Sequence, residues 1–184
     1  MRRFFDLGIL LIFFVPILIL FLFTLILCLL FQGTPIFFSQ DRGGFQNKKI
    51  KIYKFRSMKK VSNKNMVTRF GYILRIFKLD EIPQFYNVLR GDLSLIGPRP
   101  LHYEYKNLYN KHQKKRFLVK PGLTGYTQVY LKNNDTWQKK FDYDVWYVEN
   151  RSLLLDIKII FKTFYNIILI NSDAKIPKKF NGKN

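Results

Sequence analysis

Residues 9–31, "ILLIFFVPILILFLFTLILCLLF", decide the fold, because this run is almost wholly Ile, Leu, Phe and Val and contains no charged residue. As a helix rising about 1.5 Å per residue it would be ~35 Å long, enough to cross a hydrocarbon core of ~30 Å. The apolar region of a cleaved signal peptide is shorter, about 7–15 residues, and ends in small residues. The sequence therefore predicts a segment that stays in the membrane.

Two features of this segment argue against a plain transmembrane span. Pro16 interrupts it, which removes one backbone hydrogen bond and bends the helix. Both flanks are basic, since Arg2 and Arg3 precede the segment and the whole chain has a formal net charge of +20. Basic flanks stay on the cytoplasmic side, so we expect a re-entrant membrane helix over residues 1–32, kinked at Pro16, with both ends cytoplasmic. A single-pass anchor with a tolerated proline is the alternative.

The charge balance indicates anionic partners. Lys and Arg number 32, against 12 Asp and Glu, and such an excess fits nucleic acid, anionic lipid headgroups or phosphorylated small molecules. The chain contains no nucleic-acid-binding motif, so we expect membrane phospholipid and phosphate-bearing substrates, and no nucleic acid. The single cysteine, Cys28, lies inside the apolar run and is interpreted as a small buried hydrophobic residue.

The rest of the chain, residues 33–184, is expected to form an interfacial domain of mixed α+β class, mainly helical. Alternating residues from Lys49 onward and the turn at Arg42-Gly43-Gly44 predict a small β-hairpin of residues 36–40 and 49–57. The polar residues 59–67 are expected to form a loop.

Helix signals follow the hairpin. Thr68 is a suitable helix cap, Pro83 is tolerated only in a first turn, and Gly91 is a typical helix end. Together with apolar periodicity, these signals predict helices over residues 68–77, 80–91, 103–117, 137–147 and 152–170. The last helix is apolar with lysines on one side, which suits an amphipathic helix at the membrane surface. An ordinary core helix is the alternative.

The stretch "KLDEIPQFYNVLRGDLSLIGPRP", residues 78–100, places two adjacent carboxylates, Asp80 and Glu81, at the start of a predicted helix. One interpretation is structural, because free backbone N–H groups at a helix N-terminus stabilise carboxylates. The other is chemical: an ionised Asp can attack phosphorus, and its neighbour can hold a divalent cation that neutralises phosphates. The local pattern leaves both open.

Basic residues surround this pair in the sequence. Arg99 stands between two prolines that stiffen its backbone, Arg75 precedes the pair, and Lys54 and Arg56 flank Phe55 on the predicted hairpin. An arginine clamp together with a metal ion is what a pyrophosphate requires. His102 and His112 have no cysteine near them, so a zinc site is not expected.

These residues lie in a set of ordered motifs that resembles a known family. The motifs are "RRFFD", "QDRGGF", "YKFRSM", "TRFGYILR", "LDEIPQFYNVLRGDLSLIGPRP", "KPGLTGYTQV" and "FDYDVWYVENRSLLLDIKIIFKT". The chain resembles the bacterial monotopic phosphoglycosyl transferases, which are sugar-1-phosphate transferases acting on polyprenyl phosphate. Among the small members it is most similar to the N,N'-diacetylbacillosamine 1-phosphate transferases that start protein N-glycosylation.

The resemblance implies a ping-pong enzyme at the cytoplasmic face of the bacterial inner membrane, its catalytic domain being residues 33–184. Asp80 would attack the β-phosphate of a UDP-sugar, expel UMP, and pass the phosphosugar to undecaprenyl phosphate. Glu81 would serve Mg²⁺ or proton transfer. Asp144 matches a further acidic position, so the implied metal set is Asp80, Glu81 and Asp144. The implied substrate-binding residues are Arg75, Arg99, Gln128, Lys54 and Arg56.

Several alternatives stay open at this point. UDP-galactose, UDP-glucose or a UDP-N-acetylhexosamine would use the same phosphate chemistry, for capsule, exopolysaccharide or O-antigen. The sequence does not determine the oligomeric state or contact with downstream glycosyltransferases. A membrane-tethered nucleic-acid-binding protein and a non-catalytic membrane scaffold are the readings from other functional classes.

Overall fold

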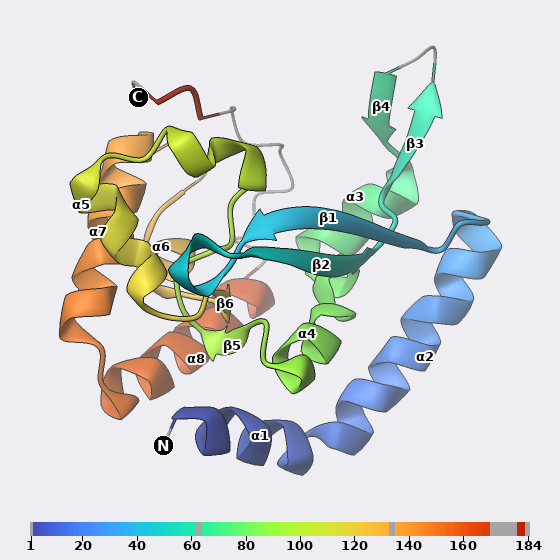
Figure 1. Ribbon diagram of the computed structural model, residues 1–184. Helices are drawn as coiled ribbons and strands as arrows, with labels where there is room; N and C mark the ends of the chain where they lie inside the picture. Colours follow the sequence, from blue (N-terminus) through green and yellow to red (C-terminus); the bar gives the residue numbers. More distant parts are fainter. Residues whose placement is uncertain (1, 62–63, 133–134, 170–179, 183–184) are drawn as a thin grey trace.

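The structure is a computed structural model that describes residues 2–61, 64–132, 135–169 and 180–182. It combines α-helices with small two-stranded sheets, and helix predominates, as the sequence predicts (Figure 1). The apolar helix lies at one side of the molecule, and the long helices α7 (Trp137–Asn150) and α8 (Leu153–Ile168) lie at the other. The end predicted for the last helix, residue 170, lies outside the described residues.

The apolar segment forms two helices, α1 (Arg2–Ile12) and α2 (Phe14–Phe31), which run in different directions (Figure 1). The helix is interrupted at Phe13, ahead of Pro16, which lies in the first turn of α2. Proline cannot donate to the carbonyl four residues earlier, that of Ile12, and its ring crowds the same carbonyl. The predicted interruption is therefore present, but it falls one turn before the proline that causes it.

Helix α2 is long and apolar enough to cross a membrane, with a mean hydropathy of 3.1 over its 18 residues. A core helix of a soluble protein can pass the same test, but only 11% of this segment is buried. Most of its large side chains are exposed, which fits contact with lipid better than contact with water. Cys28 is fully buried, as predicted.

Three residues of α1 attach it to the rest of the molecule. Both Nη atoms of Arg3 donate to carbonyls in the last turn of the helix α4 (Gln84–Arg90), those of Val88 and Leu89. The Asp6 carboxylate accepts from Ser94 Oγ at 2.7 Å and from Leu95 N at 3.2 Å. The Arg2 guanidinium forms an ion pair of 2.9 Å with Asp156, which also accepts a hydrogen bond from Tyr147. The start of the apolar segment is thus fixed to several elements of the domain.

Strands β1 (Phe37–Gly43) and β2 (Lys49–Phe55) form the predicted antiparallel hairpin. Arg42 and Gly43 belong to the strand, however, and the turn is the 3₁₀ helix η1 (Phe45–Asn47).

The loop predicted for residues 59–67 is wrong. Strands β3 (Met58–Val61) and β4 (Lys64–Val67) form a second antiparallel hairpin, which projects from the body (Figure 1). A projecting two-stranded hairpin buries little apolar surface, so its sequence does not need the alternation that identifies a half-buried strand.

The acidic pair follows helix α3 (Arg69–Ile76), whose Thr68 cap accepts from Gly71 N at 2.9 Å, as predicted. Lys78 has φ +58°, a left-handed conformation that separates α3 from the 3₁₀ turn η2 (Leu79–Glu81). The prediction that the pair opens a helix is therefore wrong in detail. Both carboxylates lie in this separate turn, and α4 begins only after Pro83.

The segment after α4 was only partly predicted. Gly91 ends α4 in a left-handed conformation with φ +86°, as expected. The short strands β5 (Ser94–Ile96) and β6 (Gly122–Thr124) pair in parallel, and α6 (Tyr126–Tyr130) follows; none of these three elements was predicted.

Three glycines allow this parallel pair to form behind Arg99 and Gln128. A Cβ on Gly97 would lie 2.4 Å from the Lys120 carbonyl oxygen, and one on Gly125 would lie 2.1 Å from that of Gly97. A Cβ on Gly122 would lie 2.0 Å from the Gly97 nitrogen. The backbones meet directly, without side chains between them.

The helix predicted over residues 103–117 is broken into η3 (Tyr103–Asn107), α5 (Lys111–Lys114) and η4 (Lys115–Leu118). Asn110 and Gln113 form a capping box that starts a new helix at this point. The aromatic side chains of this region pack together with Phe141 and Phe180 in a cluster of their own. The helices predicted at 137–147 and 152–170 are confirmed as α7 and α8.

Helix α8 is apolar on both of its faces. Ile159 and Asp156 are buried against the domain, and the opposite face exposes large apolar side chains, among them Leu154, Phe161, Phe164 and Ile168. It is therefore not an ordinary core helix, and its placement at a membrane surface stays a prediction.

Candidate active site

The two carboxylates of η2 are almost closed off from solvent. Asp80 is 6% exposed and Glu81 is 8% exposed, because the turn packs between β2 and α3. Carboxylates are seldom buried to this degree unless cations or hydrogen bonds compensate them. The surroundings of each carboxylate therefore decide what the pair can do.

Glu81 is held by two cations. Its Oε1 lies 2.6 Å from Lys54 Nζ and 2.7 Å from Arg99 Nη2. Burial by itself would raise the pKa of Glu81, but Arg99, Lys54 and Lys78 outweigh burial and hold that pKa well below its usual range. The same contact raises the pKa of Arg99. Glu81 is accordingly a fixed anion.

Asp80 is in a different state. Burial, followed by the charge of Glu81, raises its pKa, and Lys54, Arg75 and Lys78 act in the opposite direction. Within the described part of the chain Asp80 forms no ion pair, unlike its neighbour. A buried carboxylate that is poorly compensated is more reactive than one held in ion pairs, so Asp80 is the better candidate for a nucleophile.

Three other predicted residues are Arg75, Arg56 and Gln128, of which Arg75 lies near the pair. Arg75 Nε donates to Ser57 Oγ at 2.9 Å, and its charge acts on Asp80. Arg56 Nη2 donates to the carbonyls of Gln32 and Gly33, at 2.6 and 2.9 Å, just after the end of α2. Gln128 Nε2 donates to the Leu123 carbonyl at 3.2 Å, while its buried Oε1 has no partner among the described residues.

Asp144 does not join the acidic pair. Its carboxylate accepts from Arg116, with Nη2 at 2.8 Å, and from Thr127 Oγ1 at 2.5 Å. In the described ranges, no three His, Cys, Asp or Glu side chains are grouped closely enough to share a metal ion. Arg116 Nη2 also donates to the carbonyl of Arg99 at 2.6 Å, so Asp144 reaches the site through Arg116.

Two cations near the pair were not among the predicted site residues. Arg42 donates to the Pro100 carbonyl, and burial, followed by the charge of Arg99, lowers its pKa to about 10. Burial also lowers the pKa of Lys78, whose charge acts on both carboxylates. The motif "QDRGGF" contains Arg42, so the sequence offered a signal for this residue. No sequence signal predicted the left-handed conformation of Lys78.

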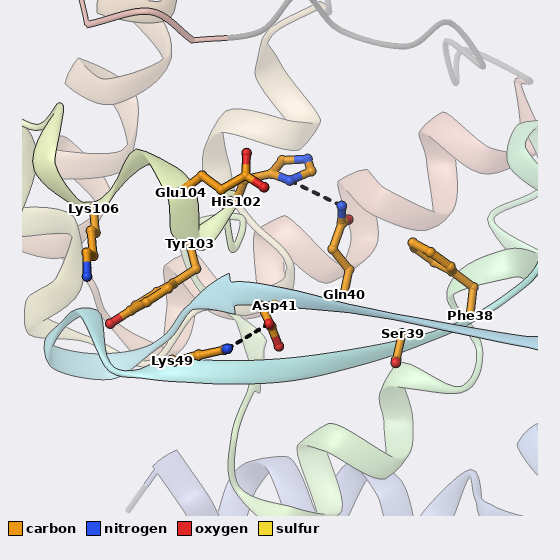
Figure 2. A pocket seen from close by; sticks show the side chains of 9 residues that line it. All are labelled: Phe38, Ser39, Gln40, Asp41, Lys49, His102, Tyr103, Glu104 and Lys106. Atoms are coloured by element: carbon orange, nitrogen blue, oxygen red, sulfur yellow. Dashed lines mark hydrogen bonds and ion pairs between the residues drawn. The ribbon is translucent and has the colours of Figure 1, made fainter. Parts of the chain in front are cut away.

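A pocket of about 510 Å³ opens beside β1 (Figure 2). Its lining carries polar and aromatic groups from β1 and η3, and its lysines are engaged: Lys49 pairs with Asp41 at 2.8 Å, and Lys106 lies over the Tyr103 ring. Phe38, at one end, is the cross-strand partner of Lys54. Such partners have Cβ atoms about 5 Å apart, so this end of the pocket lies next to Lys54, one of the two cations that hold Glu81.

Comparison with known proteins decides the family. A family model described as "Bacterial sugar transferase" matches residues 1–169, which is most of the chain. The chain belongs to the bacterial sugar transferase family. This bacterial sugar transferase is 43% identical over 159 residues to the uncharacterised sugar transferase EpsL of Bacillus subtilis, an alignment that covers 82% of this chain and 79% of EpsL.

Longer relatives match over part of their length. The UDP-N-acetylgalactosamine-undecaprenyl-phosphate N-acetylgalactosaminephosphotransferase of Aeromonas hydrophila is 38% identical, covering 81% of the sugar transferase and 39% of that protein. The UDP-glucose:undecaprenyl-phosphate glucose-1-phosphate transferase of Escherichia coli is 39% identical, covering 71% and 32%. The sugar transferase thus spans between about a third and two fifths of these two relatives and most of EpsL.

Proposed function

We propose that this protein moves a sugar-1-phosphate from a UDP-sugar to undecaprenyl phosphate, releasing UMP. Two relatives are named for this type of reaction, with N-acetylgalactosamine and with glucose. The observation that carries the proposal is the buried pair itself: Glu81 is fixed by Lys54 and Arg99 at 2.6 and 2.7 Å, and Asp80 lies beside it without an ion pair among the described residues. Cations that hold one carboxylate are also placed to neutralise phosphate oxygens.

In the first step, a carboxylate oxygen of Asp80 attacks the β-phosphorus of the UDP-sugar. The bond between that phosphorus and the oxygen bridging to the α-phosphate breaks, and UMP leaves with the electron pair. The product is a mixed anhydride that joins Asp80 to the phosphosugar. Lys54, Arg99 and Arg75 stabilise the charge that spreads over the phosphate oxygens.

In the second step, a phosphate oxygen of undecaprenyl phosphate attacks the same phosphorus. The bond between the Asp80 oxygen and phosphorus breaks, so the carboxylate is restored, and the product is an undecaprenyl diphosphate sugar. Atoms and charges balance without any further reactant.

The acidic pair fits Mg²⁺ in the manner usual for phosphate-handling enzymes, in which one or two carboxylates bind the ion together with substrate phosphates. Asp80 and Glu81 would supply these oxygens, whereas Asp144 is occupied by Arg116 and Thr127. When bound, Mg²⁺ would neutralise charge on the diphosphate.

We place the site at the cytoplasmic face of the inner membrane, with α1 and α2 as a re-entrant helix. Arg2, Arg3 and Asp6 bond to the domain at the start of this segment. At its end, Gln32 Nε2 donates to the Arg56 carbonyl and Gln32 Oε1 accepts from Thr68. The attachment of both ends of the segment to one domain supports the proposal that both ends lie on one side of the membrane, as the basic flanks predict.

The donor is proposed to bind with its phosphates near Lys54 and Arg99 and its nucleoside in the pocket of Figure 2. A diacetylbacillosamine donor follows from the sequence resemblance, and the names of the relatives support other sugars equally. All of these donors share the phosphate chemistry of Asp80.

The decisive experiment is UMP release by the detergent-solubilised protein with Mg²⁺, across a panel of UDP-sugars, with and without undecaprenyl phosphate. We expect one donor to give lipid-dependent UMP, and Asp80→Asn to abolish it. Asp142→Asn is the matched control, because that carboxylate is 49% exposed on α7. The proposal would be contradicted if no UDP-sugar in the panel gave UMP, or if Asp80→Asn released UMP at the wild-type rate.

A further inference from the structure

An apolar surface joins the membrane segment to the helix that precedes Asp80. Ile73 of α3 is 47% exposed, and Phe77, the residue that follows the last turn of α3, is 43% exposed; Phe77 N donates to the Ile73 carbonyl at 3.2 Å. Phe70, on the same helix, packs against Phe31 of α2 with ring centroids 5.2 Å apart. The exposed apolar surface of α2 therefore continues onto α3 without a polar interruption at this contact.

This surface leads to the nucleophile. Leu74 of α3 and Ile82, two residues after Asp80, share a buried cluster with Cys28 of α2. Arg56 bonds to the carbonyls that follow α2, and η2, which contains Asp80, packs against α3. Asp80 is thus at the corner where α2, α3 and η2 meet.

Two arginines with unused donors lie at this corner. Arg75, between Ile73 and Phe77 in sequence, is held through Nε by Ser57, and its terminal nitrogens donate to no residue in the described part of the chain. Arg56 is held through Nη2 by the carbonyls that follow α2, and its Nη1 donates to no residue among those that the structure describes. Arginines held in place with unused N–H groups suit phosphate oxygens.

The proposed chemistry restricts where the acceptor enters. In an in-line displacement the attacking and leaving oxygens lie on opposite sides of phosphorus. The lipid phosphate must therefore take the place that UMP vacates, opposite the Asp80 oxygen. The two substrates share this phosphate position, and they differ in what is attached: a water-soluble nucleoside or an apolar polyprenyl chain.

We propose that the surface formed by Ile73, Phe77 and the adjoining end of α2 binds the polyprenyl chain of the acceptor next to its phosphate. The inference rests on the proposed function and adds to it the path of the acceptor. The surface matches undecaprenyl phosphate, because it is apolar along α3, as the polyprenyl chain requires, and basic where it reaches Asp80, as the phosphate requires. The donor, whose nucleoside is proposed to lie in the pocket beside β1, does not contact this surface.

Ping-pong kinetics separate the two substrates, because kcat/KM for each reports only its own half-reaction. We expect Ile73→Ser and Phe77→Ser each to lower kcat/KM for undecaprenyl phosphate about tenfold, the effect of losing one well-packed apolar side chain. The lipid-free half-reaction should be unchanged, both in the UMP burst and in the phosphosugar adduct seen by intact mass. Leu118→Ser, at a residue 64% exposed on η4, is the matched control and should change neither value.

Different results would overturn the inference, assign the surface to contact with the bilayer, or refute the proposed function. An equal fall for donor and acceptor, or no fall for either, would overturn the inference. Binding to liposomes, measured by flotation, distinguishes the acceptor from bulk phospholipid: a loss of flotation in parallel with acceptor activity would show that this surface only contacts the bilayer. A wild-type protein that forms no adduct and no UMP would instead refute the proposed function. Both serine variants replace exposed side chains, and the adduct yield reports the fraction of each that is folded.

Discussion

The buried ion pair between Arg116 and Asp144 offers a sharp test of how the site is supported. The Arg116 side chain is 2% exposed and that of Asp144 is 5% exposed. The Arg116 guanidinium carbon also lies 5.5 Å from the ring centres of Phe117 and Phe141. Asp144→Asn keeps the shape of the side chain and removes its charge, so it leaves a buried arginine without its counter-ion.

The size of the effect follows from this burial. Removing one partner of a buried pair typically costs about 3–5 kcal/mol, because the remaining charge stays uncompensated. For a chain of this length each kcal/mol lowers Tm by roughly 2–4 °C, so we expect a fall of about 6–20 °C. Replacing both partners, as in Arg116→Met with Asp144→Leu, should cost much less. Burial already raises the pKa of Asp144 despite Arg116, which shows that burying the charge is expensive.

The assay is thermal unfolding in one detergent at fixed protein concentration, for Asp144→Asn, for Arg116→Met and Asp144→Leu singly, and for the double variant that combines the last two. Asp142→Asn, on the same helix but exposed, should change Tm by only a few degrees at most. At a temperature where Asp144→Asn is folded, its Mg²⁺ dependence should equal that of the wild type. A Tm within about 2 °C of wild type for Asp144→Asn, or a double variant as unstable as the sum of the singles, would refute the reasoning.

Three further predictions follow from the fold. Gly91→Ala forces a side chain onto φ +86° and should cost about 1–2 kcal/mol, whereas Gly8→Ala, with no atom within 4 Å of its Cβ, should not destabilise α1; thermal unfolding compares the two. Asp6→Ala leaves Ser94 and the Leu95 N–H without their acceptor and should cost about 2 kcal/mol by the same measurement, and an unchanged Tm would contradict that role. Chelation with EDTA should abolish UMP release reversibly without a change in Tm, and activity that persists in EDTA would rule out the proposed metal.

The sequence predicted the elements that carry local signals. Thr68 and Gly91 mark helix ends because a cap and a left-handed residue act within one turn, and the hairpin followed from its alternation. Signals failed where tertiary contacts decide. The 3₁₀ turn at Asp80 and Glu81 depends on the left-handed Lys78, and the parallel pairing of β5 with β6 depends on glycines far apart in the chain. Where the structure describes their burial, the side chains of the β3–β4 hairpin (58–60 and 65–67) are exposed or half-buried, so burial imposes no pattern on them.

The site was predicted unevenly for the same reason. Lys54 and Arg99, which the sequence grouped with the acidic pair, both form ion pairs with Glu81, and their role toward phosphate stays a prediction. Asp144 was grouped with the acidic pair through a resemblance between sequences, and its actual partner, Arg116, has no motif that connects the two. Arg42 reaches the site through a strand that the prediction ended too early.

The direct backbone contact of Gly97, Gly122 and Gly125 has a consequence for protein engineering. A library that randomises the segments behind Arg99 and Gln128 would lose nearly every member at these positions, since any Cβ there meets a backbone atom at 2.0–2.4 Å. Attempts to change which donor is accepted should leave this scaffold intact. The pocket beside β1 (Figure 2), lined by the side chains of Ser39 and Tyr103 among others, is the region where sequence diversity can be introduced at little cost in folding yield.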